Sequence, residues 1–282
     1  MIRRWCLLSL VLLLQVCSAV KLGYHQLPTI GYWWLDAHLS FTDSQTGEVR
    51  QALSQLHSWH RQQELPVYAS WLGALAAQSS NTLTEQETCK VWDDAQRLLD
   101  RTVRESIRQA APLALQLGPQ QLQHLARHWE RKNEEWEDEW LRGSPKARLE
   151  RRFERAVDRY ADFYGPLTRA QETLVRQQLQ QSVWTPEWGR RDRQRRQQDL
   201  LSTLQRLQQG DRSTAQAEAA LLGVWQRWVQ PPQLQDQQVM TDLTRQACRQ
   251  LAELHNTTSP EQRQRAARRL RAYERDLREL SP

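Results

Sequence analysis

The chain has 282 residues, with 39 Lys or Arg, 33 Asp or Glu and a formal net charge of +6. Charged residues make up 26% of it, and its 13 Trp residues supply large apolar surfaces. Disordered chains lack such bulky apolar side chains, so this composition excludes a disordered protein. The length suits one large domain or two small ones.

The first seventeen residues have the pattern of an export signal. Two arginines precede an apolar run over residues 6–14. A basic start and about 7–15 apolar residues are typical of a secretory signal peptide, whereas a membrane span needs about 20 apolar residues. Cys17 follows the run and resembles the lipid-acceptor cysteine of bacterial lipoproteins, although Val16 replaces the usual Gly, Ala or Ser. We therefore predict a signal peptide over residues 1–16 and lipidation at Cys17.

Two alternatives remain open for this segment. One is ordinary cleavage after Ala19, because Cys17 and Ala19 are small residues with the spacing of a signal-peptidase site. The other is an uncleaved anchor, for which the apolar run is short. In similar lipoproteins, Ser at the position of Ser18 favours the outer membrane. We thus expect a periplasmic, lipid-anchored protein at the outer membrane, where a nucleic acid partner is not expected.

Residues 17–41 are predicted to form the lipid anchor and an aromatic arm. Tyr24, Tyr32, Trp33 and Trp34 follow the anchor closely. These rings either dock the arm onto the folded core or lie in the membrane interface, where amphipathic rings are favoured.

Residues 42–282 are predicted to form a single all-α, multi-helix domain of long antiparallel helices. Apolar residues recur at helical spacing, and no stretch alternates apolar and polar residues for long enough to make a strand. The expected helices cover residues 43–63, 66–79, 85–116, 119–142, 145–164, 169–181, 186–209, 214–229, 235–255 and 260–280.

Five of these helices begin with a capping box. A Ser, Thr or Gly at the start is followed three residues later by Gln or Glu, whose side chain can return to the backbone of the first residue. The pairs are Thr42 and Gln45, Thr84 and Glu87, Gly118 and Gln121, Thr168 and Gln171, and Ser259 and Gln262. No fixed period accompanies them, so we predict no solenoid.

The cysteines predict one disulfide. The chain has four Cys, of which Cys6 lies in the signal and Cys17 is the lipid acceptor. The remaining pair, Cys89 and Cys248, would meet in an oxidising compartment, where disulfides persist. Two buried free thiols are the alternative. Neither has a CxxC partner, so no zinc site is predicted.

Several motifs together resemble a family of uncharacterised proteobacterial lipoproteins. They are Tyr-Trp-Trp-Leu-Asp at 32–36, Trp-His-Arg at 59–61, Glu-Leu-Pro-Val-Tyr at 64–68, and the surroundings of Cys89 and Cys248. The resemblance covers nearly the whole chain. It implies a mostly helical, lipid-anchored envelope protein with both cysteines at matching positions, and it brings no established activity.

Residues of these motifs form our candidate groove or interaction site. They are Trp33, Trp34, Asp36, Trp59, His60, Arg61, Glu64 and Tyr68. One interpretation is an acid–base cluster beside a pocket lined by His60, Glu64 and Trp34. The other is structural, with Trp59 packed inward and the polar side chains bridging to a neighbouring helix.

Other clusters have a structural and a functional interpretation. His124 and His128 can reach one metal ion or form a surface pair beside Trp129. The carboxylates over residues 130–139 could supply a catalytic pair or be solvated. The arginines over residues 190–196 either form a solvated face with ion pairs or contact anionic headgroups or cell-wall polymer.

No catalytic signature is present: the sequence lacks GxSxG, HExxH, P-loop and GxGxxG motifs. We therefore predict no catalytic residue, no metal and no cofactor. The expected function is non-enzymatic binding or scaffolding at the envelope. The expected partners are the membrane, through acyl chains, and an envelope protein or anionic polymer. The alternative is an envelope hydrolase or lyase that uses Trp59, His60 and Glu64.

Overall fold

The computed structural model describes residues 21, 23–210 and 212–282, so the predicted signal peptide and Cys17 lie outside the described residues. Over the described ranges every regular element is a helix, which confirms the all-α prediction. The α-helices are α2 (Leu27–Leu39), α3 (Asp43–Trp59), α4 (Leu65–Gln78), α5 (Glu85–Ala114), α6 (Pro119–Trp140), α7 (Pro145–Tyr164), α8 (Arg169–Gln180), α9 (Pro186–Leu207), α10 (Thr214–Val229), α11 (Leu234–Asn256) and α12 (Pro260–Leu280). A five-residue π-helix, η1 (His60–Glu64), joins α3 to α4.

The structure adds two features to the sequence prediction. The predicted aromatic arm contains helix α2, which has a proline in its first turn and whose dense run of aromatic residues hides the helical period. Between α3 and α4 the chain does not break. Pro66 lacks the amide hydrogen that an α-helix needs, and the π-helical segment just before it keeps the helix continuous. None of the described helices has both the length and the apolarity of a membrane span.

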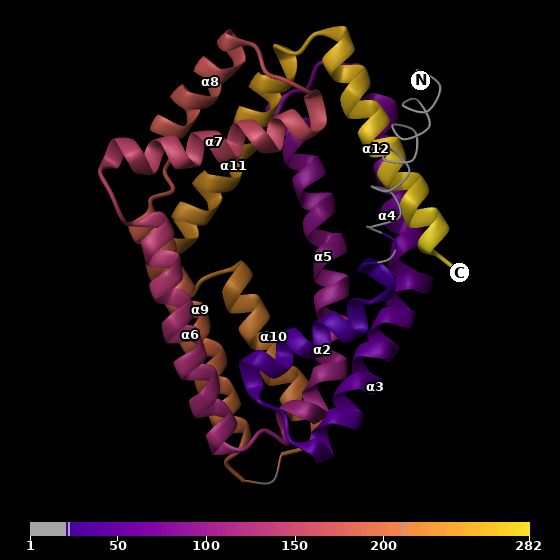
Figure 1. The fold of residues 1–282 in the computed structure, drawn as a ribbon, viewed down its shortest axis with the longest axis vertical. Coiled ribbons are helices and arrows are strands. Elements are labelled where there is room, and N and C mark those ends of the chain that lie inside the picture. Colours follow the sequence, from indigo (N-terminus) through magenta and orange to yellow (C-terminus); the bar gives the residue numbers. More distant parts are fainter. Residues whose placement is uncertain (1–20, 22, 211) are drawn as a thin grey trace, which may run out of the picture.

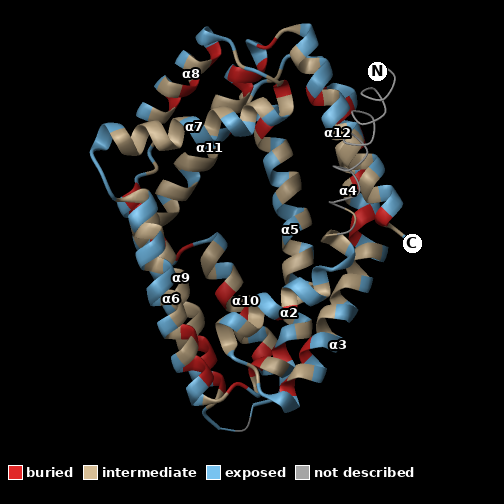
Figure 2. Cartoon of the chain, viewed as in Figure 1, coloured by how far each residue is buried: buried red, intermediate tan, exposed pale blue. Residues whose placement is uncertain are grey.

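The helices form an elongated ring (Figure 1). Helices α6 and α9 pair along one side, and α12 packs along α4 on the other. Helices α10 and α11 both pack against α5, and α2 contacts α3 and α6 near one end of the ring. Buried residues concentrate toward the two ends and along the contact of α4 with α12 (Figure 2).

The main apolar cluster lies where α5, α6, α9 and α10 meet. Its members are Ala111, Ala114, Leu117, Leu122, Leu125, Leu204, Leu207, Ala217 and Leu221. Ala111 and Ala217 are fully buried, and their small side chains allow α5 and α10 to approach closely. This cluster forms the floor beneath one end of the cavity described below, since Leu125 and Leu204 belong to both.

A disulfide joins Cys89 on α5 to Cys248 on α11, as the cysteine count predicts. The two residues are 159 positions apart in the sequence. Closing so long a loop in the unfolded chain corresponds to at most about 5 kcal/mol of stabilisation in the chain-entropy model. The bond therefore fixes α11 against the long central helix α5.

At one end of the ring, two helix N-termini are held together by a pair of glutamines. Gln45 and Gln121, the third residues of α3 and α6, exchange side-chain hydrogen bonds of 2.9 and 3.2 Å. Each glutamine oxygen also accepts from the backbone amide that begins its own helix, at Thr42 and Gly118. Each glutamine nitrogen also donates to a carbonyl of the loop before the partner helix, that of Gln116 for Gln45 and that of Ser40 for Gln121.

The opposite end repeats this arrangement with different helices. Gln171 of α8 and Gln262 of α12 exchange side-chain hydrogen bonds of 2.9 and 3.1 Å. Their oxygens accept from the amides of Thr168 and Ser259, which begin the two helices. We call these two arrangements the glutamine clasps. Each satisfies the polar atoms of two glutamines at a helix junction and closes one end of the ring.

We predict that Gln121→Ala lowers the free energy of unfolding by about 1–3 kcal/mol, because it leaves buried donors and acceptors of the first clasp unpaired. The matched control is Gln123→Ala, an exposed position on the same helix, for which we expect a change within about 0.5 kcal/mol. Urea unfolding followed by circular dichroism measures both. Equal effects of the two variants would show that the clasp contributes nothing.

Candidate functional site

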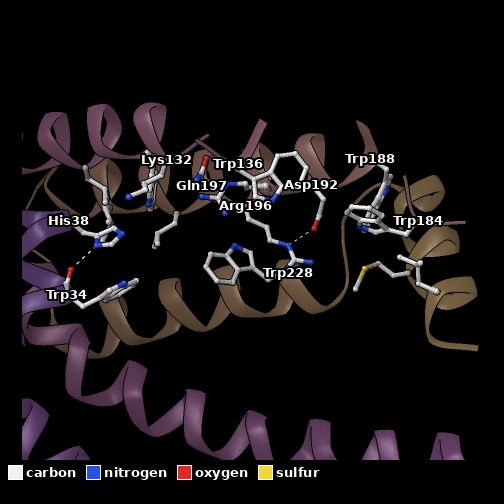
Figure 3. A pocket seen from close by; sticks show the side chains of 18 of the residues that line it. Trp34, His38, Lys132, Trp136, Trp184, Trp188, Asp192, Arg196, Gln197 and Trp228 are labelled. Atoms are coloured by element: carbon white, nitrogen blue, oxygen red, sulfur yellow. Dashed lines mark hydrogen bonds and ion pairs between the residues drawn. The ribbon is translucent and has the colours of Figure 1, made fainter. Parts of the chain in front are cut away.

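A cavity of about 1050 Å³ lies between α2, α5, α6, α9, α10 and α11 (Figure 3). This volume is at the upper limit of about 300–1,000 Å³ for small-molecule sites. Seven of the 13 tryptophans line it: Trp34, Trp92, Trp129, Trp136, Trp184, Trp188 and Trp228. The remaining wall is mostly aliphatic, with a few charged and amide side chains from α6 and α9.

Helical spacing places these side chains on the cavity wall. Trp129 and Trp136 are seven residues apart and therefore lie on one face of α6. On α9, Trp188, Asp192 and Arg196 follow one another at intervals of four, so they also form one row. The pairing of α6 with α9 turns both faces toward the same space.

The aromatic wall continues beyond the cavity as a packed series of rings. Trp140 stacks on Trp136 with ring centroids 6.1 Å apart and meets Trp184 edge to face at 5.5 Å. The guanidiniums of Arg155 and Arg152 lie over Trp140 and Trp184, at 4.7 and 4.9 Å from the ring centroids. These contacts favour a cavity wall that is ordered before any ligand binds.

The charged side chains of the wall carry an excess of positive charge. Three cations, Lys132, Arg193 and Arg196, line the cavity together with one carboxylate, Asp192. Asp192 is 8% exposed, and it pairs with Arg196 and with Arg195, both at 2.7 Å. One carboxylate therefore forms ion pairs with two guanidiniums.

Arg193 has a different environment. Its Nε donates to Oδ1 of Asn133 at 2.7 Å, and none of the described carboxylates lies within ion-pair distance of it. The indole Nε1 of Trp228, in the same wall, is buried and has no hydrogen-bond partner among the described residues. The cavity thus presents an unpaired cation and an unpaired donor.

Helix α2 forms the rim of the cavity at one end. Trp34 lines the cavity while 60% of its surface is exposed, and its ring contacts that of His38 in a tilted arrangement at a centroid distance of 4.2 Å. The His38 ring is also tilted against that of His128 of α6, at 4.1 Å. A ring nitrogen of His124 lies 3.1 Å from the carbonyl oxygen of Ala37, so both α6 histidines hold α2 in place.

No third side chain among the described residues is placed to complete a metal site with His124 and His128. Across the described ranges, no group of three or more His, Cys, Asp or Glu side chains is placed to hold a metal ion. Burial and the neighbouring cationic residues lower the pKa of His128, which favours a neutral ring in contact with His38. These histidines therefore serve as contacts between α2 and α6.

The structure does not bring the residues of the predicted groove or interaction site together in one place. Trp34 lies at the cavity rim, whereas the polar residues at 60–68 belong to a separate cluster around η1. Trp33 is 60% exposed, and Asp36 accepts from the Phe41 amide at 2.9 Å at the end of α2. A single pocket lined by His60, Glu64 and Trp34 is therefore not formed, because Trp34 lines the cavity and neither His60 nor Glu64 does.

The cluster around η1 connects four segments of the chain. Nδ1 of His60 lies 2.8 Å from the hydroxyl of Tyr24 in the arm. Glu64 is fully buried and its Oε1 lies 2.8 Å from Arg101 of α5. The Tyr68 hydroxyl meets the Thr102 hydroxyl at 2.5 Å.

Two further members of the predicted set complete this cluster. Arg61 donates to the carbonyl of Leu280 at the chain end at 2.8 Å, and Trp59 is half-buried. Because Glu64 is 0% exposed, its carboxylate is closed to a dissolved substrate in this conformation. The arrangement favours the structural interpretation, in which the polar groups bridge neighbouring helices.

The sequence singled out Trp34 and the arginines over residues 190–196, which include Arg193 and Arg196 of the cavity wall. It did not single out Trp184, Trp188 or Trp228, which supply much of the aromatic wall. A signal was available, since Trp184 with Trp188 and Trp225 with Trp228 stand at helical intervals of four and three residues.

We predict that stability falls as the pH drops below about 6.5, in part through His60. Burial lowers the pKa of His60, and of neighbouring His57, in the folded protein. The folded state then binds fewer protons than the unfolded state, so the stabilisation is complete above the unfolded pKa and is lost as the pH falls toward the folded one. Unfolding free energies at pH 7.5 and 5.5 measure this loss.

A His60→Gln variant provides the comparison. It keeps a group that can accept from the Tyr24 hydroxyl but cannot titrate. We expect a smaller loss of stability between the two pH values in this variant than in the native chain. An identical loss would assign the pH dependence to other groups.

Comparison with known proteins identifies a family but no function. A family model described as a family of unknown function (DUF6279) matches residues 37–222. This range contains Cys89 but ends before Cys248, so it is shorter than the near-complete resemblance expected from the motifs. No curated protein and no solved structure matches the chain.

Proposed function

Because this chain belongs to DUF6279, a family of unknown function, its role has to be inferred from its own residues, and we propose that it is a lipid-anchored, non-enzymatic binding protein of the bacterial envelope. In this proposal the tryptophan-lined cavity holds a largely apolar ligand. The cavity is the observation that carries the proposal, since it is a large, mostly apolar space with a few polar groups.

The chemistry of the wall favours binding over catalysis. Catalysis by proton transfer needs an acid or base that is free to reach the substrate. The carboxylate in the wall, Asp192, is already shared by two guanidiniums. The alternative hydrolase or lyase would depend on Glu64, which is buried and paired with Arg101.

Three observations support a location in the bacterial envelope. Cys17 follows the apolar run of an export signal. The disulfide between Cys89 and Cys248 suits an oxidising compartment. Leu27, Ile30, Trp33 and Trp34 of α2, ten or more residues after Cys17, are between 45 and 60% exposed, as expected for rings and aliphatic groups beside a membrane.

Blocking the cavity tests the binding function. Thr244 of α11 lines the cavity, whereas Thr241 on the same helix is exposed. We predict that Thr244→Trp weakens binding of the neutral apolar dye N-phenyl-1-naphthylamine because the indole occupies part of the cavity, and that Thr241→Trp leaves it unchanged. Fluorescence titration of the full chain in phosphatidylcholine nanodiscs, corrected for empty nanodiscs, measures both. No saturable binding by the native chain would refute the proposal.

Cell fractionation tests the anchor. We predict that Cys17→Ala moves the protein from the membrane to the soluble periplasmic fraction, because the acyl chains contribute about 0.8 kcal/mol for each buried CH₂. Cys6→Ala is the control and should stay with the membrane. Retention of the Cys17 variant in the membrane would contradict lipidation at this residue and place the anchor elsewhere.

A further inference from the structure

Building on the proposed binding function, we infer that the cavity takes an anionic amphiphile. Its carboxylate or phosphate is held by Arg193 and Arg196, and its chain lies along the aromatic wall toward Trp184 and Trp188.

The first argument is the charge of the wall. Three cations and one carboxylate line a space that is otherwise aromatic and aliphatic. The carboxylate, Asp192, already pairs with Arg195 and Arg196, and Arg193 has a neutral partner only. A bound anion would complete the coordination of these guanidiniums, whose planar donors match a carboxylate or phosphate.

The second argument is an unpaired hydrogen-bond donor in the same wall. The indole Nε1 of Trp228 is buried without a partner within the described ranges. Buried donors in folded proteins are almost always satisfied, and one without a partner in a cavity wall indicates a missing acceptor. In Figure 3 the Trp228 ring lies beside the Arg196 side chain, so one acidic group can reach both.

The third argument is the length of the cavity. Figure 3 shows Trp34 and His38 at one end, Trp184 and Trp188 at the other, and Arg196 between them. The cationic groups thus have an apolar, aromatic compartment beside them. This order of groups matches an amphiphile, with an acidic head and an extended apolar chain, better than a compact anion.

The fourth argument is the position of the rim. Trp34 forms part of the rim and belongs to α2, whose exposed apolar residues follow the proposed lipid anchor. A rim next to the bilayer would allow an amphiphile to enter from the membrane without crossing water. The volume of about 1050 Å³ is large enough for an 18-carbon acyl chain together with its head.

The test uses three probes that differ only in the head group. They are 9,10-dibromostearate, its neutral methyl ester and the corresponding dibromostearoyl lysophosphatidate. Bromine quenches tryptophan on contact. The exposed Trp33 and Trp34 beside the bilayer can be quenched by probe in the nanodisc, so the part of the quenching that Arg193→Met removes reports entry into the cavity. The full chain in phosphatidylcholine nanodiscs is titrated with each probe, with chains of the same length and bromination throughout.

We expect at least about tenfold tighter binding of the acid or the lysophosphatidate than of the methyl ester. The tighter of the two acidic probes identifies the head group, and either result supports the inference. In Arg193→Met the affinity for the acidic probes should fall about tenfold, while that for the ester stays the same. Arg191→Met, an exposed arginine on the same helix, is the matched control and should change neither.

Each contrary result has a distinct meaning. Equal affinity for acid and ester in the native chain would overturn the inference, whether or not the variants fold. If no brominated probe quenches tryptophan while the neutral dye still binds, the amphiphile is wrong and the binding function stands. If the native chain binds neither the brominated probes nor the dye, both the amphiphile inference and the proposed binding function are refuted.

Discussion

The glutamine clasps are the interaction on which the ring depends. Two helix N-termini that meet bring together partial positive charges and unpaired amides, which is unfavourable without acceptors nearby. Gln45 and Gln121 at one end, and Gln171 at the other, supply these acceptors while their own amide nitrogens reach across to the opposite loop. Because Gln45, Gln121 and Gln171 are buried and the paired amides satisfy one another, each junction has one geometry. Helix α6, which starts at the first clasp, is thereby fixed at its N-terminus, and the cavity lies along its contact with α9.

The open cavity between the helices lowers the packing energy of the residues that line it. Seven tryptophans face a cavity instead of a close-packed core, so part of their apolar surface is not in contact with protein atoms. Compensation comes from fixed contacts around the wall: the disulfide between α5 and α11, the ring series of Trp136, Trp140 and Trp184, and the shared ion pairs of Asp192. A bound amphiphile would restore the missing contacts, so ligand binding and stability are expected to rise together.

Local patterns in the sequence predicted much of the fold. The helix bounds followed from apolar spacing and from capping boxes, whose geometry depends only on residues three positions apart, and the boxes at Thr84, Thr168 and Ser259 form as predicted. The cysteine count predicted the disulfide. Helix α2 was missed because consecutive aromatic residues at 32–34 hide any 3.6-residue period. For the motif around His60 and Glu64 the sequence left a structural and a functional interpretation open, since a sequence pattern does not report whether a carboxylate is open to solvent.

The sequence by itself determined the helices, their starting residues and which residues share a face, because these depend on contacts within a few positions along the chain. Only the tertiary structure decided that capping-box glutamines pair across helices, and that Arg193 and Trp228 meet in one wall with partners missing. Those relations join residues from separate helices, and the side-chain spacing along any one helix contains no information about the helix it will face. The cavity is therefore a property of how the helices are closed into a ring, and no single segment encodes it.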